Sequence, residues 1–444
     1  MPDYRTLADT VAREIDSGQL PPGIRLPPQR EFAFQRGIAV STATRVYAEL
    51  VRRGLVSGEV GRGTYVRAPM SPRAAAFAEP RAIGVDLELN YPLLPQQGAE
   101  MAESLAAVLR QGGLDEAFRP VGTAATSAAR EIAAKFLTTN GWAPNPDALL
   151  FTGGGRQAVA ASISALARAG ERIGVEAMTY PAVIGIAARL GVDVVPVALD
   201  NEGLRPDALL DAHRAAPLKA VYVQPTLHNP LGTTMGQARR REIARVLEET
   251  GIIAVEDRIY SFLADEEPLA SLAPENTILV DSLSKRLAPG LTIGFVVAPF
   301  HLIDRMAGAI RSGGWSAAGL PLSASLQLMA DGTLSRLVVA KRTDAAERQE
   351  IARGALAGLD VKADRRAYHL WLKLPEGWRA DAYAAAAARE GIAITPASAF
   401  AVTPGHAPNA VRLALAPPSQ EELARALRTL RRLADMQQRE HRVE

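Results

Sequence analysis

Lys285 is the residue whose type and setting most suggest chemistry. It ends the run Val280-Asp-Ser-Leu-Ser-Lys285, where small hydroxyl residues replace an apolar pattern, and the chain has only six lysines beside 44 arginines. A lysine on a loop after a strand can be desolvated enough to act as a nucleophilic amine that forms a Schiff base. The neighbouring hydroxyls of Ser282 and Ser284 can hold a phosphate. A solvated loop lysine is the alternative, and for Lys285 taken alone it is favoured.

Two other expected strand ends carry groups that fit the same chemistry. Asp257 directly follows an apolar run, and Tyr260 comes three residues later. A carboxylate at that place can hold a pyridine nitrogen protonated, while a tyrosine hydroxyl hydrogen-bonds a phenolate oxygen. Asn229, followed by Pro230, offers an amide donor at the end of another run. Taken singly, a cap at Asp257 and a turn at Asn229 are the more ordinary interpretations.

A glycine-rich turn, Phe151-Thr-Gly-Gly-Gly-Arg-Gln157, is expected between a strand and a helix. Such a turn can bring backbone N–H groups and a helix N-terminus onto a phosphate, and Gly155 and Arg156 are its candidates. Three glycines are common in loops, so the turn by itself favours a structural role.

Strands that alternate with helices must position these residues, which predicts an α/β fold with a mainly parallel sheet covered on both faces. The expected strands are 148–151, 173–176, 194–198, 220–223, 252–255, 278–280 and 293–297. The expected helices include 157–168, 182–190 and 237–250. From about Lys341 a helix, short strands and a final helix over 420–436 predict a small α/β domain.

The first 68 residues have a different pattern. Apolar residues at helical spacing predict a first helix, and a second helix begins after Pro27-Pro28. A third helix is expected over 42–53, with Ser41 as its N-cap. Two short strands with a glycine-rich tip follow it. This order predicts a winged helix-turn-helix over 1–68. We expect a linker over 69–85, a large domain over 86–340 and a small domain over 341–444.

The winged segment holds ten arginines and seven acidic residues, a charge of +3. Its arginines fall on a helix start, on the expected recognition helix and on the wing tip, where phosphates and base edges would lie. The predicted DNA-binding residues are Arg30, Ser41, Thr42, Thr44, Arg45, Gly61, Arg62 and Gly63. The alternative for Arg45 is an ion pair with Glu49 one helical turn later.

The composition excludes several classes of protein. With 50 basic and 48 acidic residues the formal net charge is +2, so a nucleic-acid or membrane partner cannot be inferred from bulk charge. The absence of cysteine excludes disulfides, thiolate metal sites and a thiol nucleophile, and the sequence predicts no metal site. No signal pattern or membrane-length apolar run is present, which predicts a cytoplasmic protein with no membrane partner.

Together, and in this order, the strand-end residues resemble those of the fold-type-I pyridoxal-phosphate enzymes of the aminotransferase group, from about residue 86 onward. The resemblance implies that Lys285 carries pyridoxal 5'-phosphate, that Asp257 pairs with the pyridine nitrogen and that Asn229 and Tyr260 hold the ring oxygen. It also implies that Tyr180 stacks on the ring and that Arg412 binds a substrate or effector carboxylate. The residues implied around the phosphate are Gly155, Arg156, Ser282 and Ser284.

The N-terminal segment independently resembles the GntR class of winged helix-turn-helix repressors. The motifs are Gly18-Gln-Leu-Pro-Pro-Gly-Ile-Arg-Leu-Pro27, Gln29-Arg-Glu31, Arg53-Gly-Leu55 and Gly61-Arg-Gly-Thr-Tyr-Val66. Both resemblances in one chain point to the MocR-like regulators.

The sequence departs from the family pattern at three places. Thr292 stands where most members have a phosphate-binding arginine, and Arg156 or Arg286 could replace that cation. Phe118 stands where a tyrosine is usually donated across the dimer to the phosphate, and it cannot donate a hydrogen bond. Ala39-Val40 replace the common Ser-Arg pair of the recognition helix.

The resemblance implies a homodimeric, pyridoxal-phosphate-dependent regulator that binds double-stranded operator DNA and responds to a small amino compound or amino acid. One alternative is an active aminotransferase that carries a DNA-binding segment. Another is a DNA-binding protein whose second domain binds no cofactor, which Thr292 and Phe118 favour.

Overall fold

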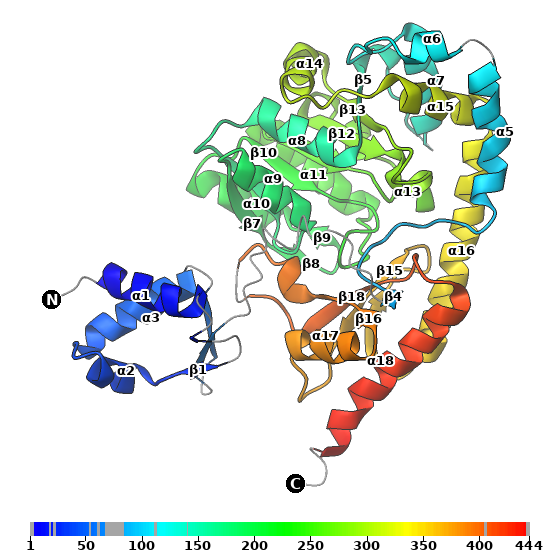
Figure 1. Cartoon of the computed structure of the whole chain (residues 1–444). Helices are drawn as coiled ribbons and strands as arrows, with labels where there is room; N and C mark the ends of the chain where they lie inside the picture. Colours follow the sequence, from blue (N-terminus) through cyan, green and yellow to red (C-terminus); the bar gives the residue numbers. More distant parts are fainter. Residues whose placement is uncertain are drawn as a thin grey trace. The chain divides into compact units, whose positions relative to one another are not determined.

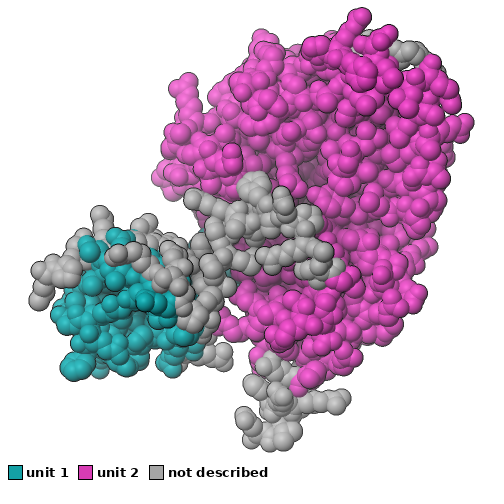
Figure 2. Space-filling model, viewed as in Figure 1, with its two compact units in different colours: residues 1–78, 403–407 teal, residues 79–402, 408–444 magenta. Residues whose placement is uncertain are grey.

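The structure, a computed structural model, describes residues 4–16, 19–20, 24–52, 55–59, 63–66, 84–110, 113–139, 141–403 and 406–440. The chain forms two compact units, residues 1–78 with 403–407 and residues 79–402 with 408–444 (Figure 2). The domain boundaries expected at residues 68, 85 and 340 stay predictions.

The first unit has the predicted winged helix-turn-helix fold. Its helices are α1 (Tyr4–Asp16), α2 (Gln29–Gln35) and α3 (Val40–Arg52), and its antiparallel sheet has the order β1 (Arg25–Leu26), β3 (Gly63–Val66), β2 (Val56–Glu59). Buried apolar side chains from all three helices form the core, among them Val11, Phe32 and Val46.

Two features of this unit differ from the sequence-based expectation. The third helix begins at Val40, because the N–H groups of Thr42 and Ala43 donate to the carbonyl of Ala39. Ser41 is therefore inside the first turn and is not the N-cap. Strand β1 was not predicted, since two residues give no periodic signal.

The second unit is built on a mixed sheet with the order β5-β13-β12-β11-β10-β6-β7 in the described part of the chain (Figure 1). Strand β13 is antiparallel to both of its neighbours, and β12, β11, β10, β6 and β7 run parallel. The strands are β5 (Leu149–Thr152), β6 (Arg172–Glu176), β7 (Asp193–Val197), β10 (Ala220–Val223), β11 (Ile253–Asp257), β12 (Thr277–Ser282) and β13 (Gly294–Val297). The predicted mainly parallel α/β sheet is confirmed.

Alternate residues of these strands pack against helices on opposite faces, which explains why the strands are apolar without a polar alternation. On one face Leu150, Val280 and Val296 contact α8 (Gly155–Leu166), α9 (Pro181–Arg189) and α14 (Ile303–Ser312). Residues of the other face, including Leu149, Leu279 and Phe295, share a core with α5 (Gln97–Arg110), α7 (Ser127–Leu137) and α15 (Gly319–Ala330). The same face is completed by α10 (Pro206–Ala215) and α11 (Gln237–Thr250).

A smaller antiparallel sheet, with the order β14-β15-β18-β17 among the described residues, follows the long helix α16 (Thr333–Ala355). It shares a core with α17 (Ala380–Arg389) and α18 (Gln420–Glu440). The strands are β14 (Asp360–Ala363), β15 (His369–Lys373), β17 (Thr395–Pro396) and β18 (Ala410–Ala414). A separate parallel pair joins β4 (Val85–Asp86) to β16 (Ile392–Ala393). No helix in the described ranges is both long and apolar enough to cross a bilayer.

Candidate functional site

The predicted site residues of the second unit gather where β10, β11 and β12 end. The register pairs Val223 with Glu256 and Asp257 with Val280, so the carboxyl ends of the three parallel strands meet at one edge of the sheet. Asn229 follows β10, Asp257 is the last residue of β11, and Lys285 lies in the short helix α13 (Leu283–Arg286) directly after β12. Crevices at such an edge are the usual ligand sites of α/β sheets.

Lys285 is partly buried, and its amine faces a segment far away in sequence. Its Nζ donates to the carbonyl oxygen of Asn90 at 2.6 Å and lies 3.5 Å from the centroid of the Tyr91 ring. Burial lowers the pKa of Lys285 well below its ordinary value, and the positive charges of Arg412 and Arg156 lower it further. A lysine with a lowered pKa is more often the neutral, nucleophilic amine.

The carboxylate of Asp257 is buried and held by three donors. Its Oδ2 accepts from the hydroxyl of Tyr222 at 2.6 Å and from Nε2 of Gln224 at 3.2 Å, and its Oδ1 accepts from the N–H of Ile259 at 2.9 Å. Burial raises the pKa of Asp257 to about 6, although these hydrogen bonds oppose the shift. A buried cationic ligand atom would favour the ionised form.

The glycine-rich turn lies against the end of β12. A Cβ atom on Gly155 would lie 3.1 Å from Oγ of Ser282, and the hydroxyls of Ser282 and Ser284 are 2.9 Å apart. Gly155 begins α8, and its N-cap residue, Gly154, makes no side-chain hydrogen bond to the first helical turn. The N–H groups at this helix N-terminus therefore face the glycine-rich turn without a side-chain acceptor from the N-cap. This arrangement of hydroxyls and N–H groups can bind an anion.

Gly294 stands between the two halves of this arrangement. As the first residue of β13 it pairs with Thr152 on one side and with Ser282 on the other. A Cβ atom at this position would lie 2.2 Å from Oγ1 of Thr152 and 2.7 Å from the carbonyl of Gly154. Only glycine permits this close approach.

Arg156 and Tyr180 lie beside each other at the same edge. Arg156 is exposed, and its Nη2 donates to the hydroxyl of Tyr91 at 3.2 Å. The pKa of Arg156 is raised, mainly by its interaction with the phenol of Tyr180. Tyr180, the residue before α9, also interacts electrostatically with Asp257.

Arg412, in β18, reaches the site from the smaller sheet. Its side chain is buried, and Nη2 donates to the carbonyl of Glu88 and, at 3.0 Å, to Oγ1 of Thr395. Its Nη1 lies 3.5 Å from Oδ1 of Asn229. Burial lowers the pKa of Arg412, and Tyr260, Glu88 and Asp86 oppose the shift.

Tyr260 completes the cluster. Its buried hydroxyl accepts a hydrogen bond from Nδ2 of Asn90 at 3.2 Å, and its ring packs against His369 with the centroids 5.4 Å apart. The structure therefore brings together all the predicted site residues of the second unit.

Several residues of this cluster were missed by the sequence analysis: Asn90, Tyr91, Tyr222 and Gln224. Tyr222 and Gln224 lie at the end of β10, so the strand-end argument that found Asn229 could have found them. Asn90 and Tyr91 carry no such signal, because their contacts lie far away in sequence.

The positions that depart from the family pattern are also placed. Thr292 lies beside the glycine-rich turn, because a Cβ atom on Gly154 would be 3.6 Å from its methyl group. Phe118 is 72% exposed and makes no part of the cluster. Arg286 is buried in an ion pair with Asp281, so of the two candidate replacements only Arg156, within the turn itself, has no carboxylate partner among the described residues.

The predicted DNA-binding residues lie in the first unit. Arg30, Ser41, Thr44 and Arg45 are exposed and Thr42 is half-buried. Oγ1 of Thr44 donates to Oε1 of Gln29 at 2.8 Å, and Gly63 begins β3 with a φ of +115°. Arg45 has no ion-pair partner among the residues that the structure describes, and a hollow lined by Arg45, Tyr4, Ala48 and Glu49 lies beside it. Gly61 and Arg62 lie outside the described residues.

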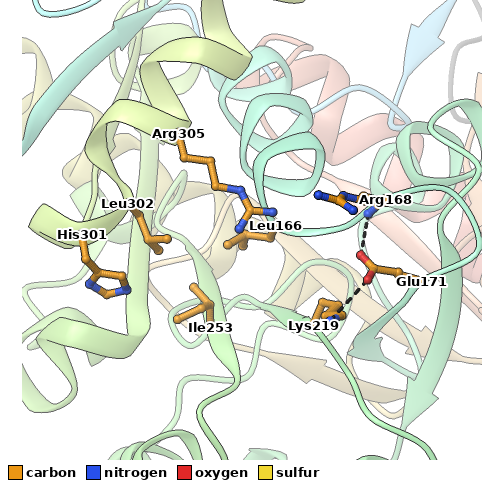
Figure 3. A pocket seen from close by; sticks show the side chains of 8 residues that line it. All are labelled: Leu166, Arg168, Glu171, Lys219, Ile253, His301, Leu302 and Arg305. Carbon is orange, nitrogen blue, oxygen red and sulfur yellow. Dashed lines mark hydrogen bonds and ion pairs between the residues drawn. The ribbon is translucent and has the colours of Figure 1, made fainter.

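A cavity of about 410 Å³ lies at the opposite edge of the large sheet and holds no predicted site residue (Figure 3). It is lined near the starts of β6, β10 and β11, where Glu171 is 3.3 Å from Nζ of Lys219 and accepts from the N–H of Arg168 at 2.8 Å.

Comparison with known proteins identifies both units. The family described as aminotransferase class I and II matches residues 83–430, and the family of bacterial regulatory proteins of the gntR type matches residues 3–66. The chain belongs to the aminotransferase class I and II family and carries a GntR helix-turn-helix domain. This combination is the MocR-like architecture.

The chain is similar to proteins named as HTH-type transcriptional regulators. The chain is 29% identical to the HTH-type transcriptional regulator YdeF of Bacillus subtilis (strain 168) over 98% of this chain and 95% of the relative. It is 26% identical to the HTH-type pyridoxine biosynthesis transcriptional regulator PdxR of Corynebacterium glutamicum, over 66% of this chain and 65% of the relative.

The solved structure of the α-aminoadipate aminotransferase LysN from Thermus thermophilus matches with a TM-score of 0.72 and 24% identity. The match covers 82% of this chain and 97% of that one. It confirms the fold of the second unit.

Proposed function

We propose that this protein is a transcriptional regulator that binds double-stranded operator DNA with its first unit and pyridoxal 5'-phosphate and an amino compound with its second. We further propose that it works as a homodimer in the cytoplasm. The observation that carries the proposal is the cluster around Lys285, which occurs in the same chain as a GntR helix-turn-helix domain.

The residues present fit pyridoxal phosphate. Lys285 would hold the aldehyde carbon, the carboxylate of Asp257 would face the pyridine nitrogen, and Asn229 and Tyr260 would hold the ring oxygen. Tyr180 would stack on the ring. Gly155 lies close to Ser282, so the N–H groups of the turn and the Ser282 hydroxyl could donate to one phosphate, with Ser284 and Arg156 as further donors. When bound, the cofactor supplies an electrophilic carbon that reacts with amines.

The effector would be an amino compound with an anionic group. Arg412 is a buried cation that contacts a carbonyl, a hydroxyl, an amide oxygen and the Phe400 ring, and it has no ion pair with a carboxylate in the part of the chain that the structure describes. A planar guanidinium in such a place favours a carboxylate, which it can bind through two parallel hydrogen bonds.

The DNA-binding surface would be α3 with the start of α2. Arg45, Thr44 and Ser41 share the exposed side of α3, and Arg30 lies in the first turn of α2. We propose Thr42, Gly61, Arg62 and Gly63 as further contacts on the same helix and on the wing.

Exposed apolar residues support the homodimer. Leu109, Phe118 and Leu320 are at least 40% exposed, and they lie on or directly after α5, α6 (Gly113–Ala117) and α15, which pack together. Apolar exposure on neighbouring elements is typical of a surface that another chain covers.

One experiment tests the proposal and its alternatives. The absorbance spectrum of the purified full-length chain would be recorded with pyridoxal phosphate and then with a panel of amino compounds. The same samples would be titrated with DNA that the chain selects from a random library. We expect a visible band, its change by an amino compound and a change in DNA affinity. The absence of a visible band would favour a second unit without cofactor.

The rate of multiple turnover distinguishes a regulator from an active aminotransferase. A regulator should show multiple turnover with keto acids far below the usual enzyme range of about 1 to 1,000 per second. Sustained turnover within that range would favour an active aminotransferase instead.

A further inference from the structure

The segment Leu87–Leu94, which we call the strap, crosses the candidate site between two hydrophobic cores. At one end Leu87 is fully buried in the core of the smaller sheet, where its N–H donates to Ala393 and its carbonyl accepts from Ala414. At the other end Leu94 is buried in the core shared by α5 and α7. The strap therefore joins the two sheets that contribute residues to the site.

All three cations of the site contact the strap. Arg412 Nη2 donates to the carbonyl of Glu88, Lys285 Nζ to the carbonyl of Asn90, and Arg156 Nη2 to the hydroxyl of Tyr91. In addition, the side chain of Asn90 donates to Tyr260. The strap is thus one wall of the site, and its main-chain oxygens occupy donors that an anionic ligand would use.

A carboxylate would compete with the strap for Arg412. A carboxylate brings a full negative charge to the guanidinium and can accept two parallel hydrogen bonds from it, whereas the Glu88 carbonyl is neutral and accepts one. Nη2 of Arg412 is shared between Glu88 and Thr395, and Nε has no hydrogen-bond partner among the described residues. A ligand that took the Nη2 hydrogen donated to Glu88 would break the hydrogen bond that holds this carbonyl against Arg412, and the strap would shift away from the guanidinium to make room for the carboxylate.

The shape of the strap at Glu88 depends on Asp86. Oδ1 of Asp86 accepts from the N–H groups of Glu88 at 2.7 Å and of Leu89 at 2.9 Å, which fixes the turn that aims the Glu88 carbonyl. Asp86 is the last residue of β4. The residues that precede β4 in the chain connect this strand to the winged helix-turn-helix. The strap is therefore continuous with the connection between the units.

We propose that the strap reads the occupancy of the effector site: a carboxylate bound to Arg412 displaces the Glu88 carbonyl, and the displacement passes through Asp86 and β4 to the connection with the DNA-binding unit. This inference rests on the proposed function.

The test compares Asp86→Ala with Asp86→Asn. The asparagine keeps an Oδ1 acceptor for both N–H groups and removes only the charge, so it is the matched control for the turn. For each full-length variant we would measure the ratio of operator dissociation constants with and without the amino acid that changes the visible spectrum at the lowest concentration. Couplings of this kind are usually about 5- to 150-fold.

Asp86→Asn should keep the wild-type ratio, whereas Asp86→Ala should bring it close to one while the amino acid still changes the spectrum. A wild-type ratio in Asp86→Ala would overturn the proposal for the strap. Failure of every amino acid to change the spectrum of the wild-type chain would instead overturn the proposed function.

A second measurement needs no variant. Amide hydrogen exchange of residues 84–94 would be followed in the wild-type holoprotein with the same amino acid and with its decarboxylated amine. Exchange should become faster with the amino acid and stay unchanged with the amine, because only the amino acid offers a carboxylate to Arg412. A change in spectrum with equal exchange for both compounds would contradict the strap mechanism and leave the site assignment intact.

Discussion

The two units place their candidate functional residues in opposite environments. In the winged helix-turn-helix Arg30, Ser41, Thr44 and Arg45 are exposed, whereas in the aminotransferase-like unit Asp257, Asn229, Tyr260 and Arg412 are buried. Exposed cations on long side chains suit a polyanion whose counterions they release. Buried groups fixed by neighbours suit one small ligand with a fixed set of donors. Substitutions in the first unit should therefore change the salt dependence of DNA binding. Substitutions in the second unit should change the free energy of buried groups that are removed from water.

The largest effect is expected at Lys285. Lys285→Ala should abolish the visible absorbance of protein-bound pyridoxal phosphate, because the amine that holds the aldehyde is removed. Lys373→Ala is the matched control, since Lys373 is an exposed lysine of β15 that pairs with Asp360 at 3.4 Å. A pyridoxyl group found on another lysine after borohydride reduction and peptide mapping would contradict the site.

Asp257 should make the stability of the cofactor-free chain depend on pH. An acid whose pKa is higher in the folded than in the unfolded chain stabilises the fold at low pH, and that stabilisation is lost as the pH rises. For Asp257 the loss falls between its unfolded value of about 3.9 and about 6, and it amounts to about 3 kcal/mol. Urea titrations should show that the wild type loses this much relative to Asp257→Asn between pH 4 and pH 7. Parallel pH profiles of the two chains would show that the carboxylate is not desolvated.

Arg156 tests an intermediate case, an exposed cation beside a partly buried site. Arg156→Ala should weaken pyridoxal phosphate binding by about 1.5 to 3 kcal/mol, the range for a hydrogen bond to a charged group. Arg168, an exposed arginine at the opposite edge of the sheet, gives the matched control Arg168→Ala. An unchanged dissociation constant in Arg156→Ala would contradict the compensation for Thr292.

The smallest effects belong to the first unit. Arg45→Ala should cost about 1 to 3 kcal/mol and relax preference at particular operator positions, because a helix in the major groove reads base edges. Arg30→Ala should weaken binding evenly and lower the salt slope by about one, as expected for a phosphate contact. Competition with point-substituted operators decides between them. An equal loss for every operator in Arg45→Ala would exclude base reading by Arg45.

Much of the second unit was predictable because its elements have strong local patterns. The bounds of β10 and α11 agree with the expected ranges 220–223 and 237–250. The clustering of Asn229, Asp257 and Lys285 followed from polar residues that directly succeed apolar runs, and parallel pairing brings such ends together.

What the sequence did not show depends on contacts between distant segments. Asn90 is 195 residues from Lys285, and nothing in the pattern around Asn90 indicates that its carbonyl meets an amine. Arg286 is a different case: it follows Lys285 directly and lies in a buried ion pair with Asp281, five residues earlier, which the run of small hydroxyl residues between them does not indicate. Adjacent residues can thus have unlike surroundings, and only the three-dimensional arrangement separates them.

Gly294 has a consequence for how such chains diverge. Because any side chain there would collide with Thr152 and with the main chain of Gly154, only glycine at this position keeps the glycine-rich turn and Ser282 on adjacent strands in their observed places. Lineages that still depend on the cofactor should be unable to leave glycine at this place, whereas lineages that have abandoned it are free to drift. The identity of one small residue on a strand would then separate ligand-dependent from ligand-independent regulators in a survey of sequences.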